Sequence, residues 1–104
     1  MKLKEVKFSV ILPILEREDI LIGFPLAIES IYENTLRPDQ VLVIIDGLVS
    51  NSFKNLILSF QKKYLFDLIW TDKKIGLDKA LNLGLSKCKN EIIFRADGDD
   101  INLK

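Results

Sequence analysis

Residues 41–47 of the chain read Val41-Leu42-Val43-Ile44-Ile45-Asp46-Gly47. This stretch is an unbroken apolar run, rich in β-branched residues, that ends at an aspartate and a glycine. A strand covered on both faces has this pattern, whereas a strand with one face in water alternates between apolar and polar residues. Similar runs occupy residues 8–12, 67–70 and 91–96. The sequence therefore predicts buried strands of the kind found in parallel sheets.

Segments of helical period separate these runs. The first is predicted to begin near Phe24-Pro25, because proline is tolerated in a first helical turn, and to run to about Asn34. The second runs to Tyr64 with Ser52 as its expected N-cap. The third covers residues 77–87 and carries small residues that would let it lie close to a sheet. Its expected inward-facing residues are Ala80, Leu81, Gly84, Leu85 and Cys88.

The resulting order is β-α-β-α-β-α-β with short connections. Such an order predicts an α/β fold, a Rossmann-like parallel sheet with helices on both faces. We expect residues 1–104 to form a single domain, or the first part of one. Ligands of such sheets gather at the carboxyl ends of the strands. The last predicted strand ends only a few residues before Lys104, so the chain stops where such a site would continue, and we expect a partial domain.

Composition narrows the possible functions. Fifteen basic and fifteen acidic residues balance, so no nucleic-acid partner is expected. There is no histidine, which excludes imidazole bases, Ser-His nucleophile systems and His-containing zinc sites within the chain. The single cysteine, the charged start and the lack of a long apolar run predict a cytoplasmic protein without a signal peptide.

The strand ends supply the candidate chemistry. Asp97-Gly98-Asp99-Asp100 follows the last strand, and such a cluster of carboxylates suits Mg²⁺ or Mn²⁺, which complete their shells with water and substrate phosphates. The other interpretation is a solvated turn that caps a following helix. Asp46-Gly47, which ends the second strand, is either an ordinary turn or part of the same site.

Other nucleotide-binding folds do not match. No G-x-G-x-x-G follows the first strand and no G-x-x-x-x-G-K-[ST] occurs, which argues against a dinucleotide-binding domain and a P-loop protein. A phosphorelay receiver would need an acidic pair where Pro13-Ile14-Leu15 stands. An EF-hand loop is excluded because Ile101 replaces a ligand and the glycine is misplaced.

Together these residues resemble glycosyltransferase family 2, whose catalytic domain has the GT-A fold. The segment 8–13 is similar to the family's opening S-V-I-I-P strand, and Val43-Ile44-Ile45-Asp46-Gly47 to its V-V-D-D-G segment. Residues 76–84 match G-x-x-x-A-x-N-x-G, and residues 97–100 match the D-x-D-D signature. The resemblance implies that the chain is the N-terminal half of a GT-A fold and binds a nucleotide-sugar donor, expected to be a UDP-sugar.

The resemblance also implies residue roles. Asp46 would bond the base, with Pro13 lining that pocket, and Asp97 would contact the ribose or the metal side. Asp99 would hold Mg²⁺ or Mn²⁺ against the donor diphosphate, while Gly76 and Asn82 would shape the loop and helix beside the donor. Arg17 and Lys79 are either phosphate contacts or surface residues. The sequence departs from the family pattern at Leu15, Leu48 and Leu81.

The resemblance places the catalytic base and the acceptor-binding half beyond residue 104. We therefore expect donor binding but no sugar transfer by this chain alone, the acceptor of the full-length enzyme being a glycan or a lipid-linked sugar at the inner face of a membrane. Self-association is predicted through residues 92–94, an apolar strand edge. The alternatives are a non-enzymatic α/β regulatory or interaction module and, less well matched because no glycine-rich phosphate loop opens the chain, a sugar nucleotidyltransferase.

Overall fold

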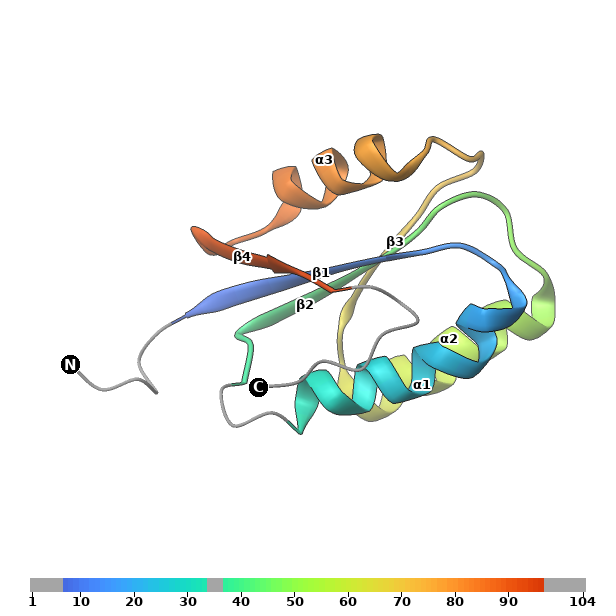
Figure 1. The fold of residues 1–104 in the computed structure, drawn as a ribbon, viewed down its shortest axis with the longest axis horizontal. Coiled ribbons are helices and arrows are strands. Elements are labelled where there is room, and N and C mark those ends of the chain that lie inside the picture. The colour runs from blue at the N-terminus through green and yellow to red at the C-terminus, as the bar shows by residue number, and fades with distance from the viewer. Residues whose placement is uncertain (1–6, 34–36, 97–104) are drawn as a thin grey trace.

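The computed structural model describes residues 7–33 and 37–96, which form a four-stranded sheet with helices on both faces (Figure 1). The strands are β1 (Phe8–Ile14), β2 (Gln40–Ile45), β3 (Asp67–Trp70) and β4 (Ile92–Arg95). Their order is β3-β2-β1-β4, and every adjacent pair is parallel. This arrangement confirms the α/β fold and the element order predicted from the sequence.

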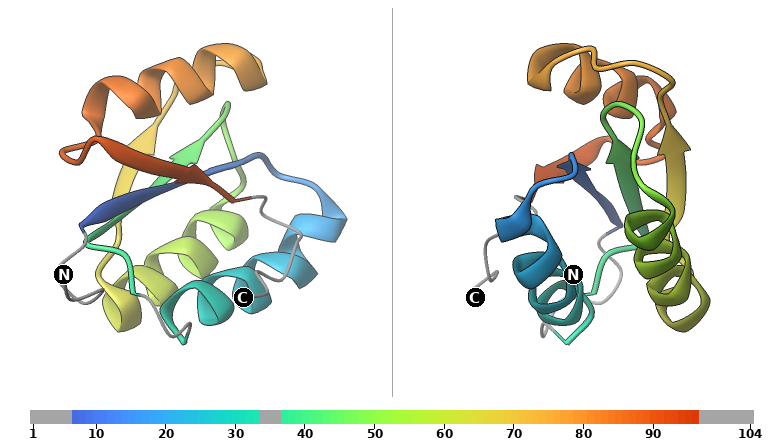
Figure 2. Two further views of the ribbon diagram at one scale, coloured as in Figure 1. Left: turned by 60° about the vertical axis from the view of Figure 1, so that its left-hand side comes forward. Right: turned by 90° about the vertical axis from the view of Figure 1, so that its right-hand side faces the viewer.

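The central strands β1 and β2 separate two apolar clusters. Val10, Leu12 and Ile14 face the layer of α1 (Glu18–Tyr32) and α2 (Asn51–Tyr64), while Ile11 faces α3 (Leu77–Lys87) on the other side. Figure 2 shows α3 alone on one face and α1 with α2 on the other. Burial on both faces explains why these strands read as continuous apolar runs.

Helix α1 begins at Glu18, so the predicted start near Phe24-Pro25 is wrong. Pro25 lies inside the helix, where it removes one backbone hydrogen bond. The helix persists through this position because its inner face is buried over its whole length, not only from residue 24 onward. The buried residues of α1 are Ile20, Phe24, Ala27, Ile28 and Ile31.

The N-cap of α2 is Ser50, which corrects the prediction of Ser52. The Ser50 hydroxyl accepts a bond of 3.3 Å from the Phe53 amide, the third residue of the helix, as N-caps commonly do. At the other end Leu65 takes the left-handed conformation with φ 61°, and its amide donates to the Gln61 carbonyl. Phe53 and Ile57 form the fully buried part of the inner face of the helix.

Helix α3 covers the predicted residues and approaches the sheet closely at Gly84. A Cβ atom at this position would lie 2.6 Å from Ile44 Cδ1 and 3.0 Å from Ile11 Cγ2, so the glycine makes the close approach possible. Of the predicted inward residues, Ala80 and Gly84 are buried and Leu85 is 49% exposed. The prediction for Leu85 is therefore wrong, because the contact is narrow and centres on the small residues.

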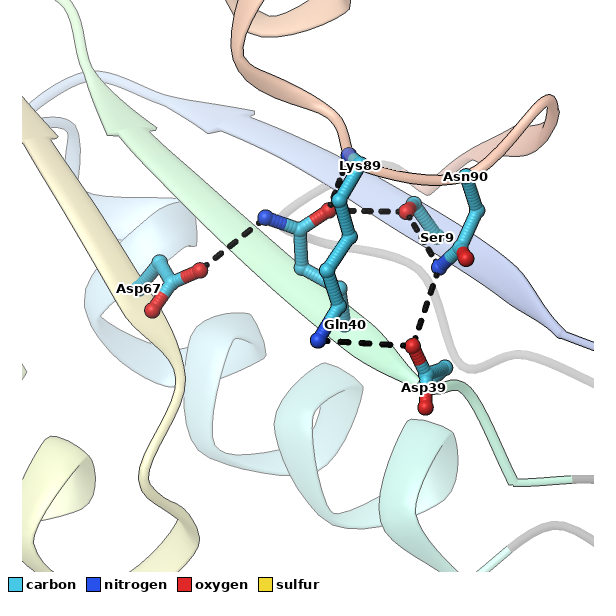
Figure 3. Close-up of polar contacts among 6 residues, drawn as sticks. All are labelled: Ser9, Asp39, Gln40, Asp67, Lys89 and Asn90. Carbon is cyan, nitrogen blue, oxygen red and sulfur yellow. Dashed lines mark hydrogen bonds and ion pairs between the residues drawn. The ribbon is translucent and has the colours of Figure 1, made fainter.

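A polar network joins the amino ends of the strands, opposite the edge where a ligand is expected (Figure 3). The Gln40 side chain donates to Asp67 and accepts from the Ser9 hydroxyl at 2.8 Å and from the Lys89 amide at 3.0 Å. The Asn90 side chain donates to Ser9 and to Asp39. These bonds connect segments far apart in the chain and fix the start of each strand against its neighbours.

Strand β4 is the outer strand on its side of the described sheet. Ile92 and Phe94 are 46% and 57% exposed, and the Phe94 ring meets Phe8 edge-on at 5.5 Å between centroids. Self-association through this edge stays a prediction. No helix among residues 7–33 and 37–96 has the length and apolar character that crossing a membrane requires.

Candidate functional site

A pocket of about 390 Å³ lies at the carboxyl ends of β1 and β2, beside the start of α3. Parallel α/β sheets place their ligand sites at this edge, and the volume is within the usual range for small-molecule pockets. The lining combines apolar and charged residues. It consists of Pro13, Ile14, Leu15, Arg17, Ile20, Asp46, Lys74, Leu77, Ala80 and Arg95.

Asp46 is the buried acid of the pocket, with 7% of its surface exposed. Its Oδ1 accepts a bond of 2.7 Å from the Ile75 amide and its Oδ2 one of 3.1 Å from the Gly76 amide. The Asp46 amide donates to the Ile14 carbonyl at 2.8 Å, which continues the pairing of β1 with β2. Because a carboxylate offers about four acceptor positions, each oxygen retains capacity for a further donor. Asp46 thus holds the loop before α3 and can still bind a ligand.

A second set of bonds fixes the same loop from its other end. The Thr71 hydroxyl donates to the Ile45 carbonyl at 2.9 Å and accepts from the Gly47 amide at 2.6 Å. Gly47 has φ +97°, and a Cβ there would lie 3.5 Å from the Lys74 backbone. A side chain is strained in this conformation, so glycine lets β2 end against the 71–76 loop. Lys74 is thereby carried to the rim of the pocket.

Glu16 connects the two loops that follow β1 and β2. Its Oε1 accepts from the Ser50 amide at 2.7 Å, and its Oε2 accepts from the Ser50 hydroxyl at 2.6 Å. These two bonds, the side-chain one first, lower the pKa of the Glu16 carboxyl from its usual value. The sequence did not predict this contact, because it joins positions 34 apart in the chain and belongs to no motif.

Three cationic residues from different segments of the chain line the pocket: Arg17, Lys74 and Arg95. Arg17 forms a two-bond ion pair with Asp19, at 2.8 and 3.0 Å, in which both side chains are half exposed. Lys74 and Arg95 were not predicted as site residues. Their positions in the sequence could have indicated both residues, because Lys74 follows β3 and Arg95 ends β4, and the ligand edge of the sheet lies at the carboxyl ends of its strands.

The structure brings together some of the predicted site residues. Pro13 and Asp46 line the pocket, and Gly76, with φ +90°, is the N-cap of α3 and bonds Asp46. Asn82 is exposed in α3 and does not belong to the lining, so its role stays a prediction.

Two departures from the family pattern also have distinct places. Leu15 lines the pocket, whereas Leu48 is 81% exposed and lies outside its lining. The predicted metal ligands Asp97 and Asp99 fall outside the described residues. Within residues 7–33 and 37–96, no three acidic or cysteine side chains lie together in a way that could hold a metal ion.

Comparison with known proteins identifies the family of this fold and pocket. Residues 9–104 match the family model described as glycosyl transferase family 2, and the chain belongs to this family. It is 38% identical over 96 residues to the UDP-Gal:alpha-D-GlcNAc-diphosphoundecaprenol beta-1,3-galactosyltransferase of Escherichia coli, covering 92% of this chain and 34% of that protein. It is 36% identical over 76 residues to the amylovoran biosynthesis glycosyltransferase AmsE of Erwinia amylovora, covering 73% of this chain and 29% of that protein. The chain thus spans about a third of the length of these relatives.

Solved structures agree with the fold. Staphylococcus aureus TarS residues 1-349 in complex with UDP superimposes with a TM-score of 0.72 at 19% identity, over 90% of this chain and 28% of that one. The mannosyltransferase PcManGT of Pyrobaculum calidifontis, in complex with GDP-Man and Mn2+, gives 0.71 at 19% identity, over 89% and 27%. At this identity the likeness confirms the GT-A fold predicted from the sequence and leaves the ligand to separate evidence.

Proposed function

We propose that this chain binds the nucleotide part of a UDP-sugar at the carboxyl edge of its sheet. The observation that carries the proposal is the pocket in which Pro13 and Asp46, the residues expected to hold the base, lie beside cationic side chains. A flat base suits the apolar wall formed by residues 13–15, and its N–H groups are donors for a carboxylate. The ligands named for two structural neighbours, UDP and GDP-Man, are consistent with this class.

The charges at the pocket rim support an anionic ligand. Arg17, Lys74 and Arg95 approach from three segments, and cationic side chains in such positions form charge-assisted bonds with phosphate oxygens. Among the described residues, Asp46 is the one acidic member of the lining, so the pocket combines an acceptor for a base with several donors for a diphosphate. This division matches the two ends of a nucleoside diphosphate.

A divalent cation completes the proposal. The Ala96 amide donates to the Ile11 carbonyl at 2.8 Å, so β4 leads the chain toward the pocket edge. Oxygen ligands such as Asp97 and Asp99, which follow in the sequence, are those that Mg²⁺ and Mn²⁺ prefer. Such an ion, when bound, stabilises the negative charge that develops on a leaving diphosphate. The Mn2+ named for one structural neighbour is consistent with a metal in this role.

We extend the proposal to the acceptor class. The acceptor named for the E. coli relative is a lipid-linked diphosphate sugar, and the Erwinia relative is named for polysaccharide biosynthesis. We therefore propose transfer to a lipid-linked or glycan acceptor, with the protein on the cytoplasmic side of the membrane. The non-enzymatic module considered from the sequence has no observation in its favour once the family is known.

Amide NMR titration tests donor binding. UDP is added with and without Mg²⁺ to the wild type and to Asp99→Ala, with Glu91→Gln as a control that removes an exposed charge from the residue before β4. We expect metal-dependent shifts at Ile14, Asp46 and the start of α3, retained in the control and lost in Asp99→Ala. Shifts that are absent, or that are the same without metal, would contradict the proposed site.

A further inference from the structure

The residues that follow β1 differ in whether they line the pocket. Leu15 and Arg17 line the pocket, while Glu16 between them does not belong to the lining. Its carboxylate instead takes two bonds, at 2.7 and 2.6 Å, from the backbone and side chain of Ser50. Two bonds to one carboxylate fix its orientation more firmly than a single contact does. The position of Leu15 and Arg17 is thereby tied to the loop that leaves β2.

Ser50 has a structural task of its own. It is the N-cap of α2, and its hydroxyl accepts from the Phe53 amide while it donates to Glu16. Phe53 is fully buried in the core between α2 and the sheet, so the anchor for Glu16 is a rigid part of the molecule. The bridge therefore transmits the position of a well-packed helix start to a segment that lines the pocket.

From this geometry we propose that Glu16 is a positioning residue for donor binding, holding Leu15 and Arg17 in place through Ser50. The inference rests on the proposed function, since it assigns a residue to the same pocket. It names a group outside the lining and outside the family motifs recognised in the sequence. Glu16 itself contacts no ligand in this proposal.

Charge alone predicts the opposite effect, which makes the proposal testable. A carboxylate near a site for a nucleoside diphosphate repels the ligand, so its removal should strengthen binding if repulsion were its main influence. If Glu16 acts by holding the loop, its removal should weaken binding in spite of the lost repulsion. Glu18, exposed in the first turn of α1, provides a matched control for the charge.

The experiment compares Glu16→Ala, Glu16→Gln and Glu18→Ala with the wild type by titration with UDP and Mg²⁺. We expect Glu16→Ala to raise Kd about tenfold, the factor that corresponds to one lost bond of about 1.4 kcal/mol. Glu16→Gln keeps an oxygen that can accept from the Ser50 amide, so it should restore most of the affinity. Glu18→Ala should leave Kd unchanged or lower it.

The amide exchange of Ser50 reports on the bridge without any ligand. It should become faster in Glu16→Ala and stay close to the wild-type rate in Glu18→Ala. In the double variant, Glu16→Ala with Ser50→Ala, the loss of binding should be smaller than the sum of the losses in the two single variants, because both changes break the same contact.

The outcomes separate the two proposals. A wild type that binds UDP while Glu16→Ala binds like Glu18→Ala overturns the positioning role and leaves the donor site intact. A lower melting temperature of Glu16→Ala with unchanged Kd overturns it as well, since the bridge would then serve the fold only. A wild type that binds no UDP overturns the proposed function and the positioning role with it.

Discussion

The most informative perturbation is Asp46→Asn, because this side chain belongs both to the fold and to the proposed site. The carboxylate is 7% exposed and accepts bonds of 2.7 and 3.1 Å from the Ile75 and Gly76 amides. An asparagine can accept only one of them, and its NH₂ group then faces the other amide. A donor left without an acceptor costs about 1–3 kcal/mol, so we expect the free energy of unfolding to fall by about this amount.

Urea unfolding measures this cost directly. Trp70 is the only tryptophan and lies at the end of β3, next to the Thr71 contact, so its fluorescence reports on the same region, with far-UV circular dichroism as a second probe. Asp72→Asn, an exposed change on the same loop, should stay within about 0.5 kcal/mol of the wild type. In Asp46→Asn the transition midpoint should fall at constant slope, and the Gly76 amide should exchange faster.

An unchanged stability would contradict a structural role for Asp46. If Asp46→Asn unfolds within about 0.5 kcal/mol of the wild type and the amides of residues 75 and 76 keep their protection, the two bonds contribute nothing measurable. Asp46 would then act on ligand alone. Asp46→Ala is less informative, since it removes both acceptors and the expected loss of about 2–6 kcal/mol approaches the whole stability of a domain of this size.

Other predictions test the core, a buried phenol and the polar network. Gly84→Val places a branched side chain where even a single Cβ atom would lie 2.6 Å from Ile44 Cδ1, so the free energy of unfolding should fall by about 1–3 kcal/mol. A variant as stable as the wild type would contradict the close packing. Burial, with a smaller contribution from a nearby carboxylate, raises the pKa of Tyr32 to about 12, so an ultraviolet titration should show one late phenol. Because the folded-state pKa is above the usual 10.0, this contribution to stability is complete below about pH 10 and disappears as pH rises through 12; Tyr32→Phe should remove that dependence. Gln40→Leu should cost about 1–3 kcal/mol in urea unfolding, whereas Lys89→Ala, which removes only an exposed ion pair of 3.4 Å, should cost less than about 1 kcal/mol.

The sequence predicted β1 and β2 because burial on both faces leaves a clear apolar signal. The expectation of burial was wrong for β3 and β4, which are the outer strands of the described sheet and contain no buried residue. The sequence analysis placed the start of α1 too late, because a proline usually marks the first turn of a helix. In the structure the packing of residues 20–24 against the core extends the helix back to Glu18, and this packing cannot be recognised from the local pattern. Ser50 and Ser52 are equally good N-cap candidates by residue type, and the structure chooses Ser50, which Glu16 also contacts. Contacts between distant residues decide these points, and local patterns do not contain them.

The same limit applies to the candidate site. Asp46 and Pro13 were predicted because each belongs to a family motif at or near the end of a strand, and both line the pocket. The bonds from Asp46 to residues 75 and 76 cross 29 and 30 positions of the chain. Lys74 reaches the rim only because those bonds, with Thr71, fix its loop. Sequence patterns therefore identified residues at strand ends and missed those that a neighbouring loop delivers.

The structure also changes how a loss of binding at this pocket should be interpreted. Asp46 accepts two loop amides and lines the pocket, so a variant at this position removes a ligand contact and loosens the loop that carries Lys74. Glu16 lies outside the lining, and removal of its charge alone would strengthen binding, so a loss of binding in Glu16→Ala comes through the loops that it joins. Comparing the two separates contact from positioning. If Asp46→Asn abolishes binding while residues 75 and 76 keep their protection, the interaction that is lost is the ligand contact. If protection and binding fall together, as the protection of the Ser50 amide and UDP binding should in Glu16→Ala, the pocket depends on its loops being held at the ends of β1 and β2.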